Sequence, residues 1–419
     1  MQLERFGVPI ALIAGLIGLC LGPYGAISIL PEEVMHLWTQ LPSPLLTLVF
    51  ATLMLGRAIP RKKSFFYPVA AQSLLALLIG FGQYVVGGLI VLFILIPKLG
   101  VDPLMGSLIE IGFEGGHGAA AIMGKSLDRL GFPEGLDLGL AMATIGLLSS
   151  TVIGSGLVVL GRFQGWLSQD EGGGKKNLLD DVESSITPFE QARILVVNLA
   201  LTGSAVALGV LMLSLLRFIS SFFGGILEEV VLAFPVFPLA LLASLFIRFV
   251  LEATDKTEVV SPLLQREIGI LSTDLLIATA MAGLNLPLLR NDWFPLTVLA
   301  IAGLTWNLFG MFVFAKLILK KEWFERSVAE FGNATGVAAS GLLLLRLADP
   351  RNLTETLPIF SVKQLLLQPL LSGGLITVIA PLFITKLGLL EWTEICSAIT
   401  ALLLLIAILF PFLSSFDVE

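Results

Sequence analysis

The sequence predicts an all-α polytopic membrane protein built from two inverted-topology repeats. Three observations lead to this fold class. Apolar residues make up 56% of the 419-residue chain and charged residues only 14%, about half of what a soluble domain carries. The apolar residues form about ten blocks that approach the ~20 residues needed to span a bilayer. Two stretches rich in glycine and alanine interrupt this pattern, one in each half of the chain.

The apolar blocks are expected to be helices. In lipid every backbone polar group must be satisfied within its own segment, and a barrel would need short alternating strands that this sequence lacks. Five expected spans fall in the first half of the chain, at residues 6–22, 43–59, 67–97, 137–161 and 191–217. Five more fall in the second half, at residues 231–252, 266–286, 293–320, 365–386 and 394–416. The third and eighth blocks are long, so we expect them to tilt or to protrude.

The two small-residue stretches, at about 105–128 and 327–346, each follow a long block. Each half then contains five spans and one odd segment. An odd number of spans makes the second half enter the membrane from the opposite side, as in the inverted repeats of many transporters. We therefore expect a first repeat at 1–220 and a second at 225–419. A cytoplasmic loop is expected at 162–190, and its polar, Gly-rich stretch at 168–187 is expected to be a flexible tether.

The basic residues indicate the orientation. With the N-terminus in the cytoplasm, nineteen of the 25 Lys and Arg residues fall inside and six outside, in agreement with the positive-inside rule. Both termini are then cytoplasmic, and we expect the protein in the cell inner (plasma) membrane. The first small-residue stretch would dip into the bilayer from outside and the second from the cytoplasm, so that their tips meet near the midplane.

Small residues recur every four positions in both stretches, and such a stripe lets helix backbones approach closely. They are Gly112, Gly116, Ala120 and Gly124, and then Gly332, Gly336 and Ser340. Breaks in the helix would free carbonyl groups for a sodium ion and N–H groups for a carboxylate. Tight helix packing without any ligand is the alternative.

Residues at the two tips are candidates for substrate binding: Gly115, Gly116, His117, Gly118, Asn333, Thr335 and Gly336. The His117 ring would bind a substrate carboxylate, relay a proton or tie down the loop. Asn333 and Thr335 offer side-chain oxygens, with local capping as the alternative.

Polar side chains within or beside the helices are candidates for sodium binding: Gln83, Asp274, Asn307 and Ser340. Gln83 and Asn307 would otherwise join helices to each other, and Asp274 would otherwise pair with Arg266. Glu110 and Glu114 would bind a cation or lie at an exposed loop mouth.

The first stretch resembles the bacterial sodium/glutamate symporter family (the glutamate:Na+ symporter, or ESS, family). That family carries a DPLMG run followed by GGHG, and residues 102–106 and 115–118 match these runs. The resemblance implies two inverted repeats, opposed re-entrant loops and sodium-coupled uptake of glutamate. The second stretch, FGNATGVAASG, departs from the GHCGFGLGATP-like run of better-known members.

We therefore expect a secondary active transporter that couples sodium entry to glutamate uptake by alternating access. The expected partners are glutamate, the sodium ion, the lipid bilayer and a second copy in a homodimer. We expect no nucleic acid partner, no transition metal and no cofactor besides Na+ as the coupling ion. Transport of another carboxylate or exchange of Na+ for H+ remains open, as does an ion channel made from opposed half-helices. The sequence shows no HExxH, GxSxG or paired catalytic carboxylates, so we do not expect an enzyme.

Overall fold

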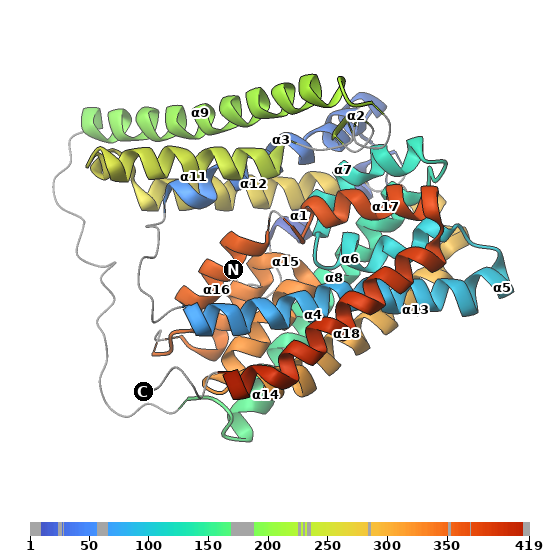
Figure 1. Ribbon diagram of the computed structural model, residues 1–419. Coiled ribbons are helices and arrows are strands. Elements are labelled where there is room, and N and C mark those ends of the chain that lie inside the picture. The colour runs from blue at the N-terminus through green and yellow to red at the C-terminus, as the bar shows by residue number, and fades with distance from the viewer. Residues whose placement is uncertain are drawn as a thin grey trace.

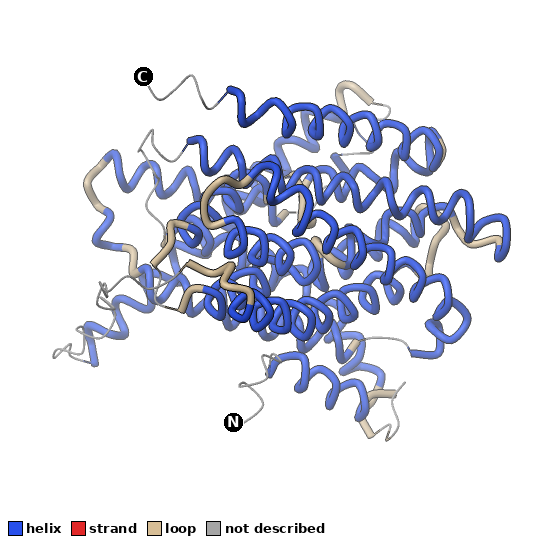
Figure 2. Tube along the Cα trace, turned by 90° about the horizontal axis from the view of Figure 1, so that it is seen from below, coloured by secondary structure: helices blue, strands red, loops and turns tan. Residues whose placement is uncertain are grey.

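The structure is a computed structural model. It describes residues 10–23, 27, 29–56, 66–168, 188–224, 228, 231–232, 236–283, 286–350, 353–368 and 370–413. Every regular element in these ranges is a helix (Figure 2). The α-helices are α1 (Ile10–Leu21), α2 (Glu32–Gln40), α3 (Pro42–Leu55), α4 (Phe66–Ile90), α5 (Ile96–Leu99), α6 (Leu108–Gly112), α7 (Gly116–Arg129), α8 (Gly135–Phe163), α9 (Pro188–Ser220), α11 (Phe237–Ala253), α12 (Pro262–Ala282), α13 (Leu286–Phe309), α14 (Ala315–Ile318), α15 (Trp323–Ala348), α16 (Thr356–Leu367), α17 (Leu375–Leu387) and α18 (Leu389–Leu413).

Seven of the described helical stretches are long and apolar enough to cross a membrane. They are Glu33–Leu55, Phe66–Leu99, Gly135–Phe163, Ala192–Ser220, Asp292–Ile318, Trp323–Ala348 and Leu389–Leu409. The chain is thus a multi-pass helical membrane protein, as predicted. The predicted span at 365–386 is wrong as a single helix, because α16 ends at Leu367 and α17 begins at Leu375. The Ser-Gly-Gly run at 372–374 lies in this interruption, and both Ser372 and Gly373 have positive φ.

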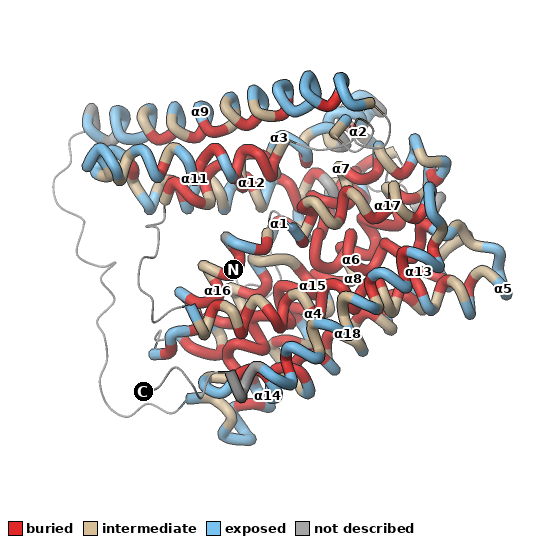
Figure 3. The backbone as a smooth tube through the Cα atoms, in the orientation of Figure 1, coloured by how far each residue is buried: buried red, intermediate tan, exposed pale blue. Residues whose placement is uncertain are grey.

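The helices form two groups that differ in their contacts (Figure 1). The hairpin bundle comprises α4 to α8 and α13 to α18, and it contains both small-residue stretches. The companion bundle comprises α1, α2, α3, α9, α11 and α12, in which α3 packs against both α11 and α12. Contacts of α7 with α3 and α12 join the two bundles. Figure 3 shows that buried residues concentrate in the hairpin bundle, whereas α9 is mostly exposed.

Both predicted long blocks are confirmed as long helices, and each contains a π-helical segment near its end. α4 continues through the π-helix Val91–Leu95 into α5, and α13 continues through Gly310–Phe314 into α14. A π-helical turn inserts one extra residue and shifts the face that the rest of the helix presents. Each of these long helices is followed in the chain by one of the two broken segments.

The second small-residue stretch is a helical hairpin. Its backbone leaves helical geometry at Gly336 and Val337, in the middle of α15. A Cβ atom on Gly332 would lie 2.8 Å from the Gly341 Cα atom, although nine residues of straight helix would separate them by about 13 Å. The two arms of α15 therefore fold back on each other, and the absence of side chains at both glycines permits this contact.

The first small-residue stretch is broken in a related way. A short 3₁₀-helix, Pro103–Ser107, leads into α6, and a turn at 113–115 separates α6 from α7. Ile111 and Ala120, on either side of the turn, both lie within 4 Å of a Cβ position on Gly139 of α8. The predicted interruption of both stretches is confirmed, whereas their insertion from opposite membrane faces stays a prediction.

Closure of the second hairpin predicts a strong effect at Gly341. A Cβ atom there would lie 2.6 Å from the Ala329 carbonyl oxygen, so Gly341→Ala should lower the free energy of unfolding by about 1–3 kcal/mol through overpacking. Gly156→Ala is the control, because a Cβ atom at this α8 position meets nothing within 4 Å. Thermal unfolding in detergent measures both, and an equal Tm for the two variants would contradict the packed hairpin.

Candidate functional site

Both helix breaks face one cavity of about 100 Å³. The first broken segment contributes residues 114–118 to its wall, and the second contributes 336–339. The rest of the lining comes from α3, α8, α12 and the segment between α16 and α17. The cavity therefore lies where the companion bundle meets the hairpin bundle. None of the described residues that line it is Lys or Arg, and Glu114 is its acidic residue.

Gly116 is required at the first break for two reasons. Its φ is +65°, a conformation that side chains other than glycine rarely adopt. A Cβ atom there would also overlap Cγ1 of Val337, so the two broken segments touch at this point.

α7 begins at Gly116, and the first N–H groups of a helix have no partner within the helix. These groups and the helix dipole favour an anion at the cavity.

His117 lies in the cavity wall and is tied to α8. The side chain is buried, and its Nε2 atom forms a hydrogen bond of 3.1 Å with Thr144 Oγ1. The Thr144 hydroxyl also donates to the Leu140 carbonyl. This hydrogen bond fixes the His117 ring beside the start of α7. The position is compatible with two of the roles expected for His117, contact with a ligand and anchoring of the loop.

Val337 carries backbone strain at the second break. Its φ of 66° and ψ of 171° are unusual for a β-branched residue, and such conformations cost on the order of 1–3 kcal/mol. Gly336 precedes it, and a Cβ atom on Gly336 would overlap the Ser150 side chain. Strain of this kind persists only where surrounding packing imposes it, and it concentrates at functional sites.

Gln83 and Asn307 meet behind the second break. Gln83 Nε2 donates to Asn307 Oδ1 (3.0 Å) and to the Ala334 carbonyl (2.7 Å). Asn307 Nδ2 donates to the same carbonyl (3.0 Å) and to Thr335 Oγ1 (3.0 Å). The two long helices, α4 and α13, thus jointly hold the turn of the second hairpin. Gln83 Oε1 is buried and has no donor among the described residues.

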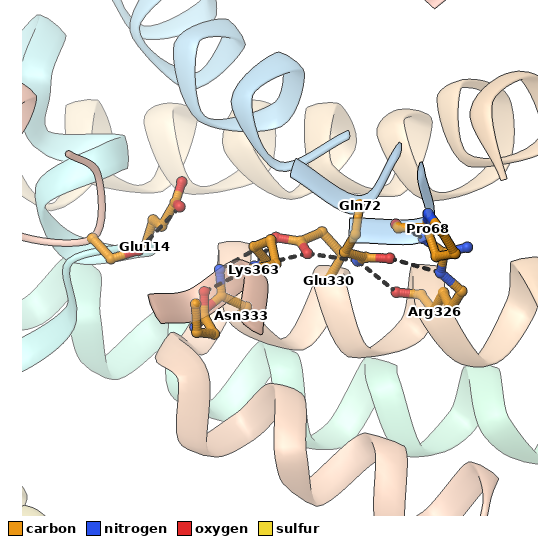
Figure 4. Close-up of polar contacts among 9 residues, drawn as sticks. Pro68, Gln72, Glu114, Arg326, Glu330, Asn333 and Lys363 are labelled. Carbon is orange, nitrogen blue, oxygen red and sulfur yellow. Dashed lines mark hydrogen bonds and ion pairs between the residues drawn. The ribbon is translucent and has the colours of Figure 1, made fainter. Parts of the chain in front are cut away.

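A buried ionic cluster holds the first arm of α15 (Figure 4). Lys363 Nζ lies 2.9 Å from the Glu330 carboxylate and donates to Gln364 Oε1 (2.8 Å), and Lys363 and Glu330 are each 1% exposed. Gln72 Nε2 donates to Glu330 (2.8 Å), and Arg326 Nε donates to Gln72 Oε1 (3.1 Å). This cluster joins α15 to α4 and α16.

The structure brings most of the predicted substrate-binding residues together. Five of them line the cavity: Gly115, Gly116, His117, Gly118 and Gly336. Asn333 instead faces the ionic cluster, where its Oδ1 accepts from Gln364 Nε2. Thr335 is held by Asn307. Ligand binding by any of these residues stays a prediction.

The predicted sodium-binding residues lie outside the cavity wall. Gln83 and Asn307 form the contacts behind the hairpin turn. Ser340 is buried, with its Oγ 2.9 Å from a Cβ position on Gly336. Asp274 is exposed, whereas its neighbour Thr273 lines the cavity. A sodium site at Asp274 would therefore be separate from this cavity.

Sequence reasoning missed the segment between α16 and α17. Gln368 and Ser372 from this segment line the cavity, and the Ser372 hydroxyl donates to Glu114 Oε1 (3.1 Å). The available signal was the Ser-Gly-Gly run inside an apolar block. Glu330 and Lys363 were missed as well, although a charged residue inside an apolar helix suggests a functional or paired role.

Two broken helical segments that meet at a cavity inside a multi-pass helical protein define a membrane transport protein. The chain belongs to the sodium/glutamate symporter family, because the model of that family matches residues 1–324. The match confirms the resemblance seen at DPLMG and GGHG, and it supports a sodium-coupled glutamate transporter rather than an enzyme. It ends just after the start of α15. A search of curated proteins found no match.

The contact between the two breaks predicts a specific effect at Gly116. Gly100 and Gly116 share a φ of +65°, but a Cβ atom on Gly100 meets nothing within 4 Å. Gly100→Ala should therefore show only the cost of the left-handed backbone, roughly 1 kcal/mol. Gly116→Ala should lose about 1–3 kcal/mol more, because its Cβ overlaps Val337. Thermal unfolding of both purified variants tests this, and equal losses would argue against contact between the segments.

Proposed function

We propose that the protein is a secondary active transporter that couples sodium entry to glutamate uptake by alternating access. The observation that carries the proposal is the cavity between the two bundles, into which both helix breaks project. A substrate bound there would contact both bundles at once. Movement of one bundle against the other would then expose the substrate first to one side of the membrane and then to the other.

The cavity offers hydrogen-bond donors for a carboxylate. The N–H groups at the start of α7 lie in or beside its wall, whereas the Thr273 hydroxyl already donates to the Gly269 carbonyl and His117 Nε2 is bonded to Thr144. Because the wall contains no Lys or Arg among the described residues, the charge of an anionic substrate needs another counter-ion. A co-transported sodium ion supplies it, and binding of the two is then mutually favourable.

Oxygen atoms for sodium are available behind the second break. Gln83 Oε1 is buried and receives no hydrogen bond from the residues that the structure describes. Asn307 Oδ1, Thr335 Oγ1 and the Ala334 carbonyl lie in the same group of contacts. Sodium is a hard cation that binds such oxygens. Its entry across ~100 mV supplies about 2.3 kcal/mol per ion, so coupling to several ions would drive glutamate uptake against its gradient.

The proposed inverted repeats, 1–220 and 225–419, are supported by the order of the elements. In each half a long helix with a π-helical segment precedes a broken segment, and each break contains one cavity-lining residue with positive φ, Gly116 and Val337. The last helices of the proposed repeats differ, because α9 packs on α11 whereas α18 packs on α4. The symmetry we propose is therefore best supported for α4–α7 and α13–α15.

In this proposal the termini are cytoplasmic, the protein lies in the inner membrane, and it forms a homodimer.

Uptake of labelled glutamate into proteoliposomes tests the proposal. An inward sodium gradient should drive accumulation, and replacing sodium by potassium or dissipating the gradient with an ionophore should abolish it. Competition by unlabelled glutamate, aspartate and citrate identifies the cargo among small carboxylates. Sodium flux without any carboxylate, at rates far above those of carriers, would instead indicate a channel and overturn the proposal.

Asn307→Ala tests the sodium ligands. The substitution removes an oxygen and two of the hydrogen bonds that hold the turn of the second hairpin. The sodium concentration for half-maximal uptake should therefore rise about tenfold or more, which corresponds to ~1.4 kcal/mol of binding free energy. Thr305→Val on the same helix is the control, since Thr305 is exposed and bonds only within α13. An unchanged sodium dependence in Asn307→Ala, with normal protein yield, would remove Asn307 from the site.

A further inference from the structure

Glu114 is a buried carboxylate in the cavity wall that forms no ion pair with any residue the structure describes. It is 3% exposed. Its Oε1 atom accepts one hydrogen bond, from the Ser372 hydroxyl at 3.1 Å. Its Oε2 atom is buried and has no donor among the described residues. A carboxylate in this environment is strongly destabilised in its charged form, because it has lost its hydration and gained one neutral donor in return.

Glu110, four residues earlier in α6, is much better solvated by the protein. Its Oε2 atom accepts from the Tyr84 hydroxyl at 2.6 Å, and its Oε1 atom accepts from Thr377 Oγ1 at 2.7 Å. The backbone N–H of Ser372 also donates to it. Two carboxylates so close together do not both stay charged easily. The difference in donors assigns the charge to Glu110 and the neutral form to Glu114.

The basic side chains of the ionic cluster are already occupied. Lys363 pairs with Glu330 at 2.9 Å and bonds Gln364, and Arg326 bonds Gln72. Figure 4 shows Glu114 to one side of this cluster, without a hydrogen bond or ion pair to it. The elements packed around Glu114 contribute five titratable groups: Tyr84 on α4, Glu110 on α6, His117 on α7, Glu330 on α15 and Lys363 on α16. Glu110 and Glu330 favour a neutral Glu114, and paired Lys363 opposes this only weakly.

The space around Oε2 suits a proton better than a metal ion. A Cβ position on Gly80 lies 2.9 Å from Oε2 and 2.9 Å from Leu371 Cδ1, so backbone of α4 and an aliphatic side chain enclose this oxygen. A sodium ion would need several further oxygen ligands there. A proton needs no additional space.

We propose that Glu114 is a proton-binding site, and that a proton enters the cell together with the substrate. This inference rests on the proposed transport function and adds a second coupling ion to it. In the outward-facing state a proton from water bonds to Oε2 and converts the carboxylate into a carboxylic acid. In the inward-facing state the same O–H bond breaks, and the proton passes to cytoplasmic water. Neutral Glu114 no longer repels an anionic substrate, so proton and substrate bind with positive linkage.

The sign of the pH dependence follows from this linkage. Apparent affinity for glutamate should rise as the external pH falls, by at most ~10-fold per pH unit for a single linked proton. Ser372→Ala removes the one donor to charged Glu114 in the described part of the chain, which favours the protonated form. In a plot of apparent glutamate affinity against external pH, the midpoint of the transition should therefore move to higher pH in this variant.

Proton movement is measured directly with pyranine inside proteoliposomes, at a membrane potential clamped by potassium and valinomycin. Glutamate added with an inward sodium gradient should acidify the lumen in the wild-type protein. In Glu114→Gln the number of protons per glutamate should fall to zero, whatever uptake rate remains. Glu258→Gln, which changes an exposed carboxylate far along the chain, should acidify the lumen like the wild type.

Each outcome distinguishes the inference from the proposed function. Sodium-driven glutamate uptake by the wild type without acidification overturns the proton site alone, whereas no sodium-driven uptake overturns the transport function. A loss of labelled sodium per glutamate in Glu114→Gln, without any proton movement, assigns the site to sodium and overturns the inference. If Glu114→Gln does not fold, the wild-type proton flux and the midpoint in Ser372→Ala decide the question, and an unshifted midpoint counts against Glu114.

Discussion

The structure depends on one constraint: backbone that leaves helical geometry in an apolar environment must find its hydrogen bonds inside the protein. The second hairpin meets this constraint through the Ala334 carbonyl, which accepts from both Gln83 and Asn307. These amides come from the two long helices, one in each half of the chain. The break is therefore stable only when the halves are assembled around it. This dependence also explains why a strained residue such as Val337 persists at the tip, since its surroundings are fixed by contacts that the hairpin itself cannot supply.

The buried ion pair has a related role in positioning. Charges taken out of water cost more than their attraction usually returns, so a pair such as Lys363 and Glu330 is weak evidence for stability. What the pair does supply is geometry, because each group has additional hydrogen bonds that fit only one arrangement of α4, α15 and α16. The hairpin bundle is thus tied together by polar contacts. The companion bundle touches it through α7, α3 and α12, which surround the cavity. A motion between bundles would change the cavity and leave the ionic cluster intact.

The sequence contained enough to locate the helices and the two breaks, since hydropathy blocks and clustered glycines are local signals. It also indicated that Gln83 and Asn307 could join helices to each other, and the structure shows them bonded across 224 positions. Hydrogen bonds between residues far apart in the chain produce no local sequence pattern. The bonds from Gln72 to Glu330 and from Ser372 to Glu114 were therefore not predicted. The block at 365–386 looked like one span because its apolar residues outweigh the Ser-Gly-Gly run. Asp274 lies outside the cavity wall because the face of a helix that meets a cavity is set by its neighbours, and its role as a sodium ligand stays a prediction.

Charge balance connects these features to transport. A loaded site that carries net charge is expensive to move through the low-dielectric interior of a bilayer, so the site gains from binding ions that neutralise its contents. The cavity wall supplies no basic side chain among the described residues, and Glu114 adds a negative charge to that of the substrate when it is ionised. With Glu114 neutral, a single sodium ion balances a singly charged amino acid such as glutamate. With Glu114 ionised, two sodium ions are required. The protonation state of one wall residue thereby sets how many sodium ions accompany each substrate, and Ser372, as its only hydrogen-bond donor in the described chain, tunes that number.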